Sequence, residues 1–326
     1  MDEENLEAIS EELWGCAYPC RFVTTNDMRL QFNLRPETCY CNIPRLSYLF
    51  YHVELIVDHY FPRRADAQNL TVTFEYESTV GGVSTRIPLP IYYPLGVLMD
   101  MVGWSVHDDH PIDGQSFTIH FRIDQQLISE GSTKIDSAEK DGSRMLRQQQ
   151  KASCTSMCGC ATPVFTFEPQ NTEKISESIK TNDFRTFQGT YAKLMETIRK
   201  RAVQSSVPPD VYHVIIHKEH KAHRSFSISQ SVHKTLGALL RDTVDCFADL
   251  TDEQIVNDVP DSKAFGRVLV QGVEPDLCTP IDFLAEAMGT PDFALHITVL
   301  QPPTSEKKRS ILSKCRDPQS PLFDRK

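Results

Sequence analysis

The chain has 326 residues, 40% of them hydrophobic and 24% charged, which is an ordinary globular composition with room for two or three small cores. Its formal net charge of −10 argues against nucleic-acid binding, because affinity for phosphate backbones needs a basic face. No apolar run approaches the roughly 20 residues of a membrane-spanning helix, and the acidic start, Met-Asp-Glu-Glu-Asn, opposes a secretory or mitochondrial presequence. We therefore expect a cytoplasmic protein whose membrane contacts are peripheral.

A first domain is expected over residues 11–123, after an N-terminal segment of residues 1–10. A short helix around Trp14 opens it, with Trp14 in a core or capping role. The alternation of Leu30, Phe32 and Leu34 then predicts the first strand. The later elements are a helix from Pro44 to Tyr60, a strand over 70–76, a hairpin turn at Gly81-Gly82 returning near 87–90, a short helix over 93–99 and a last strand over 117–123.

The middle of the chain, residues 124–205, is expected to be a helix-rich domain. Residues 172–180 and 183–201 have helical patterns, and the second of these has an apolar stripe typical of a helix that packs between domains. Residues 153–168 instead combine glycine and proline with clustered serine, threonine and cysteine. Such a composition is poor helix material and predicts an irregular loop.

A second domain is expected over residues 206–301. Its apolar pattern gives strands over 212–216 and 226–228, a helix over 236–247, a strand at 268–270, a short helix after Thr279-Pro280 and a strand over 295–299. This is the element order of a ubiquitin-like domain, and the first domain matches it in part. We therefore predict an α+β fold with two ubiquitin-like β-grasp domains flanking a helix-rich domain. Residues 302–326, with the basic run 307–309, are expected to be a disordered tail.

Ten cysteines are compatible with a reducing compartment. Cys154, Cys158 and Cys160 lie close together in sequence, as do Cys39 and Cys41, but neither spacing forms a zinc knuckle. Free or buried thiols are therefore the favoured interpretation, and the group of three is open to redox chemistry.

Three histidines spaced by three residues, His217, His220 and His223, fall between two predicted strands beside lysine and arginine. A metal site is conceivable, but a solvated basic loop fits better. We therefore expect no metal and no cofactor.

Short motifs in both halves of the chain occur in one order. They read PRLSYL at 44–49, FEYE at 74–77, YPLGVLMD at 93–100, NDF at 182–184, KLM at 193–195, TLGALL at 235–240, VQGVEP at 270–275, TP at 279–280 and ALHI at 294–297. Together they cover residues 11–301 and resemble the autophagy protein 5 family.

The resemblance implies a scaffold without catalytic residues of its own. Members are joined through one lysine to the C-terminal glycine of the ubiquitin-like autophagy protein 12, and they bind the N-terminal helix of autophagy protein 16. The E2-like autophagy proteins 10 and 3 are the implied enzyme partners. The assembled complex acts like an E3 ligase, promoting transfer of autophagy protein 8 to phosphatidylethanolamine on the phagophore, or preautophagosomal, membrane during autophagosome formation.

The family's acceptor lysine is followed by glutamate, alanine and aspartate, and this sequence departs from that pattern. Counting from the flanking motifs places the acceptor between about residues 147 and 153. Lys151 is the only lysine in that window, so it is the predicted conjugation acceptor, with Lys140 as the second candidate. Lys151 as a plain solvated lysine stays an open interpretation.

Two other classes of function stay open. An unconjugated ubiquitin-like adaptor would lack the acceptor helix, either because a loop replaced it or because residues 153–168 come from an error in the gene model. An enzyme with a cysteine–histidine nucleophile, using Cys246 or Cys158, finds no support in a local motif.

Overall fold

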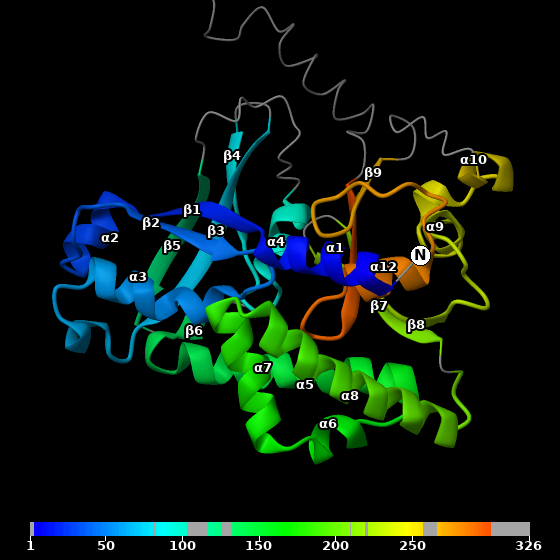
Figure 1. The fold of residues 1–326 in the computed structure, drawn as a ribbon. Coiled ribbons are helices and arrows are strands. Elements are labelled where there is room, and N and C mark those ends of the chain that lie inside the picture. Colours follow the sequence, from blue (N-terminus) through cyan, green and yellow to red (C-terminus); the bar gives the residue numbers. More distant parts are fainter. Residues whose placement is uncertain are drawn as a thin grey trace, which may run out of the picture.

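The computed structural model describes residues 3–80, 83–102, 116–125, 132–208, 210–218, 221–256 and 266–300. Two β-sheets lie side by side, a group of helices runs beneath both, and the N-terminal helix α1 (Glu3–Gly15) lies where they meet (Figure 1). Among the described helices, none is both long and apolar enough to cross a bilayer. The hairpin turn expected at Gly81-Gly82, the loop histidine His220 and the tail over 302–326 lie outside the described residues.

The first sheet has the strand order β2-β1-β5-β3-β4, with β6 paired to β3. Its strands are β1 (Ala17–Val23), β2 (Cys39–Pro44), β3 (Thr71–Val80), β4 (Val83–Pro88), β5 (Phe117–Asp124) and β6 (Thr133–Lys134). Its helices are α2 (Asn26–Gln31), α3 (Val53–Tyr60) and α4 (Leu95–Met101), with 3₁₀ turns at Leu49–His52, Arg64–Ala67 and Ile135–Ser137. Strands β1 and β5 are parallel neighbours at the centre, with β2 antiparallel to β1 on one side and the antiparallel pair β3 and β4 on the other. This is β-grasp topology.

The first strand of this domain was predicted in the wrong place. Residues 26–31 form helix α2, because the Thr25 side chain caps it by accepting a hydrogen bond from the Met28 N–H. Leu30 is 82% exposed, so the alternation there marks no buried face. The true strand, β1, contains Pro19, a residue that argues against a strand when only the sequence is read. The helix expected from Pro44 also begins later, with the 3₁₀ turn at Leu49.

The second sheet repeats the same arrangement with the order β8-β7-β10-β9, in which β7 and β10 are parallel neighbours. Its strands are β7 (Val211–Lys218), β8 (Lys221–Ser229), β9 (Arg267–Leu269) and β10 (Ala294–Leu300), and its helices are α9 (Leu236–Thr243), α10 (Asp252–Val256) and α12 (Ile281–Ala287), with a 3₁₀ turn at Asp245–Phe247. These elements match the predicted order. The α+β class with two ubiquitin-like domains and a helix-rich region is confirmed.

Four helices form the helix-rich region: α5 (Ala138–Cys158), α6 (Thr162–Thr166), α7 (Pro169–Thr181) and α8 (Phe184–Gln204). The irregular loop expected over 153–168 is wrong, because α5 continues through Cys158 and α6 follows. Burial of Ser153, Cys154 and Cys158 in the interior outweighs their low helix propensity. Gly159 ends α5 in a left-handed conformation and Pro163 begins α6, so both residues punctuate helices here.

Helix α5 contacts both ubiquitin-like domains. Near its start, Gly142 lies against Phe50, and an added Cβ would come within 2.1 Å of the Phe50 ring. Further along, the Gln150 side-chain Nε2 donates to the Pro291 carbonyl at 2.9 Å. The Ser227 hydroxyl of β8 donates to the Ser156 carbonyl at 3.1 Å. The orientation of α5 is therefore set from both ends.

We expect Gly142→Ala to lower the free energy of unfolding by about 1–3 kcal/mol, because the new methyl group must displace the buried Phe50 ring. Gly189 of α8 is a matched control: it is exposed, and an added Cβ there would meet nothing within 4 Å. Gly189→Ala should raise stability by about 0.5–1 kcal/mol. Urea unfolding of both variants measures the difference, and equal effects would contradict the close contact at Gly142.

A buried ion pair joins the two ubiquitin-like domains. Arg45, after β2, lies with its Nη2 3.2 Å from Asp100 Oδ1 of α4 and its Nε 3.2 Å from Gln271 Oε1 of the second domain. The Gly272 N–H donates to Asp100 Oδ2 at 2.9 Å. Gly272 has φ of 73°, and an added Cβ would lie 2.4 Å from Arg45 Nη2, so both the backbone and the packing require glycine.

A second buried polar chain lies within the second domain, where it meets the first. His217 Nε2 is 2.7 Å from His296 Nδ1, and His296 Nε2 is 2.9 Å from Asp292 Oδ2. The Tyr93 ring packs edge-on against both imidazoles. The solvated loop expected for His217 is therefore wrong: this side chain is fully buried in β7, because its partner His296 lies on the adjacent strand β10.

Candidate functional site

Lys151 lies on α5, facing the short helix α6. Its ammonium nitrogen is 4.3 Å from the centre of the Phe165 ring, a cation–π contact, and the side chain is half-buried. Phe165 is itself 62% exposed, so the pair lies at the surface. The Arg147 guanidinium, one turn earlier on α5, donates to the Val164 carbonyl at 3.2 Å. Two cations of α5 thus face α6.

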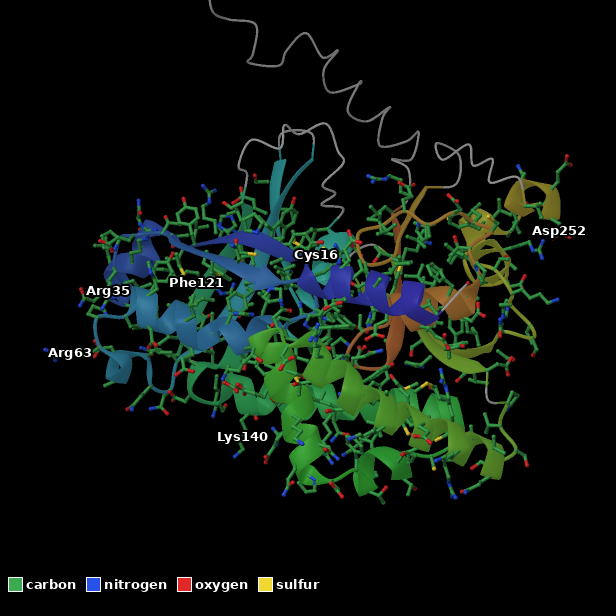
Figure 2. The ribbon with its side chains drawn as sticks, viewed as in Figure 1. Cys16, Arg35, Arg63, Phe121, Lys140 and Asp252 are labelled. Carbon is green, nitrogen blue, oxygen red and sulfur yellow. The ribbon has the colours of Figure 1, made fainter. Side chains whose placement is uncertain are left out.

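Lys140 lies in the first turn of α5, near the first domain, and projects outward (Figure 2). It is exposed and borders an open surface hollow of about 620 Å³. The two candidate lysines are eleven residues apart on one helix, so the structure does not bring them together. Neither assignment is decided by the geometry, and both stay predictions.

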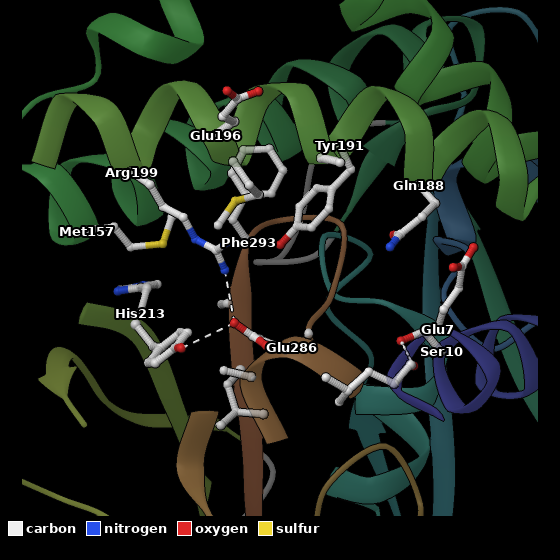
Figure 3. A pocket seen from close by; sticks show the side chains of 18 residues that line it. Glu7, Ser10, Met157, Gln188, Tyr191, Glu196, Arg199, His213, Glu286 and Phe293 are labelled. Carbon is white, nitrogen blue, oxygen red and sulfur yellow. Dashed lines mark hydrogen bonds and ion pairs between the residues drawn. The ribbon is translucent and has the colours of Figure 1, made fainter. Parts of the chain in front are cut away.

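A groove of about 480 Å³ lies between α1, α8, α12 and the second sheet. Figure 3 shows side chains of α8 facing those of α12 across it, with Glu7 and Ser10 of α1 to one side. The apolar part of its lining is Leu6, Met157, Tyr191, Ala192, Met195, Ala285, Phe293, Ala294 and Leu295. Apolar side chains that line a groove are the kind of surface on which an amphipathic helix buries its apolar face.

Charged groups border the groove. Arg199 Nη2 of α8 lies 3.0 Å from Glu286 Oε1 of α12, and the Tyr212 hydroxyl donates to the same oxygen at 3.5 Å (Figure 3). Burial, with the Glu286 carboxylate as the next cause, raises the pKa of Tyr212 to about 12, so its hydroxyl stays protonated at neutral pH. Glu7 and Glu196 also border the groove.

The groove residues were not identified from the sequence, because they come from segments far apart in the chain. The apolar stripe of α8 was predicted to pack between domains, and four of its side chains are buried: Phe184, Phe187, Leu194 and Ile198. Tyr191 and Met195 of the same stripe stay half-exposed and line the groove. Trp14 has the predicted core role, with its ring 4.4 Å from that of Phe187.

The cysteines and histidines that the sequence analysis singled out do not line this groove. Among the described residues, no group of three or more histidine, cysteine, aspartate or glutamate side chains is arranged to hold a metal ion. Cys39 and Cys41 lie on β2, and Cys246 lies in a 3₁₀ turn of the second domain. His223 belongs to β8.

Comparison with known proteins matches the two sheets to two domain models of one protein family. The family model "Autophagy protein ATG5, UblA domain" matches residues 13–123, and "Autophagy protein ATG5, UblB domain" matches residues 199–299. The crystal structure of Atg5 from Kluyveromyces marxianus superimposes with a TM-score of 0.62 at 18% sequence identity, covering 90% of this chain and 99% of the yeast chain. At that identity the likeness shows the fold.

Proposed function

The chain belongs to the autophagy protein 5 family, as its sequence motifs indicated, and from that premise we propose that it is a non-catalytic conjugation scaffold of autophagosome formation. Its role in autophagy follows from the family. The finer proposal is that Lys151 forms an isopeptide bond with the C-terminal glycine of autophagy protein 12. The observation on which this depends most is the continuous helix α5, which presents Lys151 at the surface.

The proposed conjugation asks for an accessible amine held in one place. The E2-like autophagy protein 10 would present the glycine as a thioester; the Lys151 nitrogen, once deprotonated, attacks its carbonyl carbon, and the enzyme's thiolate leaves. The contact with Phe165 holds the Lys151 side chain along α6. Among the described residues no acidic side chain pairs with Lys151, so no ion pair within this part of the chain has to be broken. Positioning by the enzyme then supplies most of the selectivity.

The groove between α1, α8 and α12 is the proposed binding site of the N-terminal helix of autophagy protein 16. Its apolar lining and charged border match a helix with one apolar face. Because residues of α1, of the helix-rich region and of the second ubiquitin-like domain line it, the bound helix would contact more than a single domain.

We expect Ala192→Arg to weaken binding of that helix about tenfold or more, since the exposed Ala192 lines the groove and a long cationic side chain would fill it. Val203→Arg is the matched control, because Val203 lies on the same helix, is 66% exposed and does not line the groove. Calorimetric titration with the helix peptide compares them. Equal affinities for the two variants would place the helix elsewhere.

The proposed activity is tested by lipidation. The conjugate, bound to autophagy protein 16, is mixed with the E2-like autophagy protein 3 charged with autophagy protein 8 and with phosphatidylethanolamine vesicles. We expect faster lipid transfer than with the E2-like enzyme alone. In the cell, we propose that this transfer takes place where the cytoplasmic complex makes peripheral contact with the phagophore membrane. No stimulation by a conjugate that forms and binds its helix would refute the E3-like role.

The alternative is an adaptor that is never conjugated. It is favoured by the missing Lys-Glu-Ala-Asp pattern around Lys151. An adaptor would bind the partner helix in the groove but would form no covalent product with autophagy protein 12.

A further inference from the structure

A small cavity adjoins the groove between α1, α8 and α12. Its volume is about 40 Å³, which is enough for a small polar group or for water, since one water molecule needs roughly 10–15 Å³. Six residues line both the cavity and the groove: Ser10, Gln188, Tyr191, Ala285, Glu286 and Gly289. The cavity is therefore next to the place where a bound helix would lie.

Two buried hydrogen-bond donors belong to residues that line this cavity. Within the part of the chain that the structure describes, neither the Trp14 indole Nε1 nor the Gln271 amide Nε2 has a hydrogen-bond partner. Trp14 is 3% exposed and Gln271 is 2% exposed, and both side chains line the cavity. Because buried donors in native proteins nearly always have a partner, two unpartnered donors at one cavity indicate that it takes an acceptor.

The chemistry of that acceptor is restricted by its surroundings. Gln271 Oε1 accepts from Arg45 Nε at 3.2 Å, so the amide orientation is set and its nitrogen is the unpartnered atom. The indole nitrogen of Trp14 can only donate. The Glu286 carboxylate borders the same cavity, which disfavours burial of a second anion there. A neutral carbonyl oxygen, whose two lone pairs accept two N–H groups, is the best match.

We propose that this cavity is a specificity subsite of the helix-binding groove. It takes the side-chain amide of an asparagine or glutamine of the bound helix, whose carbonyl oxygen accepts hydrogen bonds from Trp14 Nε1 and Gln271 Nε2. This inference rests on the proposed function of the groove. A helix with an apolar residue at that position would leave both donors unsatisfied, so the subsite selects among partner helices.

Calorimetric titration of the full chain with the autophagy protein 16 helix peptide tests the subsite. Each asparagine of the peptide is replaced in turn by leucine and each glutamine by methionine, residues of similar size that form no such hydrogen bond. One replacement should weaken binding to the wild-type chain about fivefold or more, because it removes the acceptor from two buried donors.

The same peptide replacement should weaken binding clearly less when a donor is missing from the chain. Trp14→Phe removes the indole N–H, and Gln271→Glu replaces Nε2 with oxygen while keeping an acceptor for Arg45. Gln204→Glu is the matched control, because Gln204 also accepts from an arginine, Arg201, but is exposed and lines neither the cavity nor the groove. That variant should show the full wild-type loss. Circular dichroism checks that all three variants fold.

A second measurement follows one donor directly. The chain has two tryptophans, so a ¹⁵N-tryptophan label gives two indole signals, and Trp14→Phe identifies that of Trp14. The Trp14 indole proton should move downfield when the intact peptide binds, because it gains a carbonyl acceptor. The peptide that lacks the critical amide should not produce this shift.

The outcomes separate this subsite from the groove itself. If no amide replacement weakens binding, or if the loss is the same in Trp14→Phe and Gln271→Glu as in wild type, the cavity holds only water and the subsite is refuted. Weaker binding by Ala192→Arg would still support the groove in that case. Equal affinities of Ala192→Arg and Val203→Arg would instead refute the groove and the subsite together.

Discussion

Arg45→Ala is expected to lower the free energy of unfolding by about 3–5 kcal/mol, because it leaves the Asp100 carboxylate buried without its cation. Asp100 is 2% exposed, and its remaining hydrogen-bond donor is the Gly272 N–H. Gln271 loses its partner in the same substitution. Urea unfolding measures the change. The effect is large because one guanidinium holds the junction of two domains.

The matched control for this prediction is Arg267→Ala. Arg267 Nε lies 3.3 Å from Glu274 Oε2, but both side chains of this pair are largely solvated, so its loss should cost about 0–1 kcal/mol. If both variants lose the same stability, the buried pair does not hold the domains together.

The free energy of unfolding that Arg45→Ala loses relative to wild type, here called the deficit, should also depend on pH. Burial raises the pKa of Asp100 to about 6, and the Arg45 charge opposes that rise. Without Arg45 the folded-state pKa climbs further, so the folded variant takes up a proton that the unfolded chain does not hold until near pH 4. Stability from this group therefore grows as pH falls, and the deficit at pH 5.5 should be smaller than at pH 7.5. A deficit that does not change with pH would contradict this account of Asp100.

Asp292→Ala is the second substitution with a large expected effect, about 3–5 kcal/mol. The Asp292 carboxylate accepts hydrogen bonds from the Thr290 hydroxyl, the Ala294 N–H and His296 Nε2, all of them buried. Burial alone would raise the pKa of Asp292, but the His296 charge and these hydrogen bonds outweigh it and hold the pKa below its usual range. Asp292 is therefore ionised at neutral pH. Its removal leaves the Ala294 N–H and His296 Nε2 without this acceptor, whereas the Thr290 hydroxyl keeps the Ala294 carbonyl as an acceptor at 2.9 Å.

Asp242→Ala is the matched control, because Asp242 Oδ2 lies 3.2 Å from His233 Nε2 at the surface of the same domain. Because this aspartate–histidine pair lies at the surface, its loss should lower the free energy of unfolding by at most about 1 kcal/mol. Thermal or urea unfolding at pH 7.5 compares the two variants. A loss of stability for Asp242→Ala that exceeds the loss for Asp292→Ala would show that the chain of Asp292, His296 and His217 is absent in solution.

Lowering the pH should reduce the free energy of unfolding through the same buried chain of Asp292, His296 and His217. Burial, followed by the neighbouring His296, depresses the pKa of His217 well below its usual value. The unfolded chain then binds a proton below about pH 6.5 that the folded chain refuses, so stability falls as pH falls, by about 2 kcal/mol for this group at pH 5. His217→Phe should show a smaller loss between pH 7.5 and 5 than wild type. An equal loss in both would show that His217 titrates normally.

The sequence was most informative where local pattern and tertiary environment agree. Strand β3 was found from the alternation of apolar residues over 70–76, and helix α4 from the apolar run over 93–99 that a proline opens. All residues of α4 are buried, which agrees with that run. The prediction failed where distant contacts decide. Strand β1 contains Pro19 and is held by pairing to β2 and β5, and α5 extends through Cys158 because α8 and the second sheet cover it. Neither contact is visible in a window of neighbouring residues.

The candidate site divides in the same way. Lys151 was selected by its position between family motifs, and the structure adds the ring of Phe165, which no spacing rule predicts. The groove required α1, α8 and α12 to be placed in space first. His217 was misassigned to a solvated loop because its partner His296 is 79 residues away in the chain.

Reconstituted conjugation tests the central claim most directly. The full chain, Lys151→Arg and Lys140→Arg are mixed with autophagy protein 12, its E1-like enzyme and the E2-like autophagy protein 10, and tryptic mass spectrometry locates any branched peptide. We predict a single branch at Lys151 that is absent from Lys151→Arg and intact in Lys140→Arg. A branch at another lysine would refute the site, and no conjugate from a chain that folds and binds the autophagy protein 16 helix would contradict the scaffold account and leave an unconjugated adaptor.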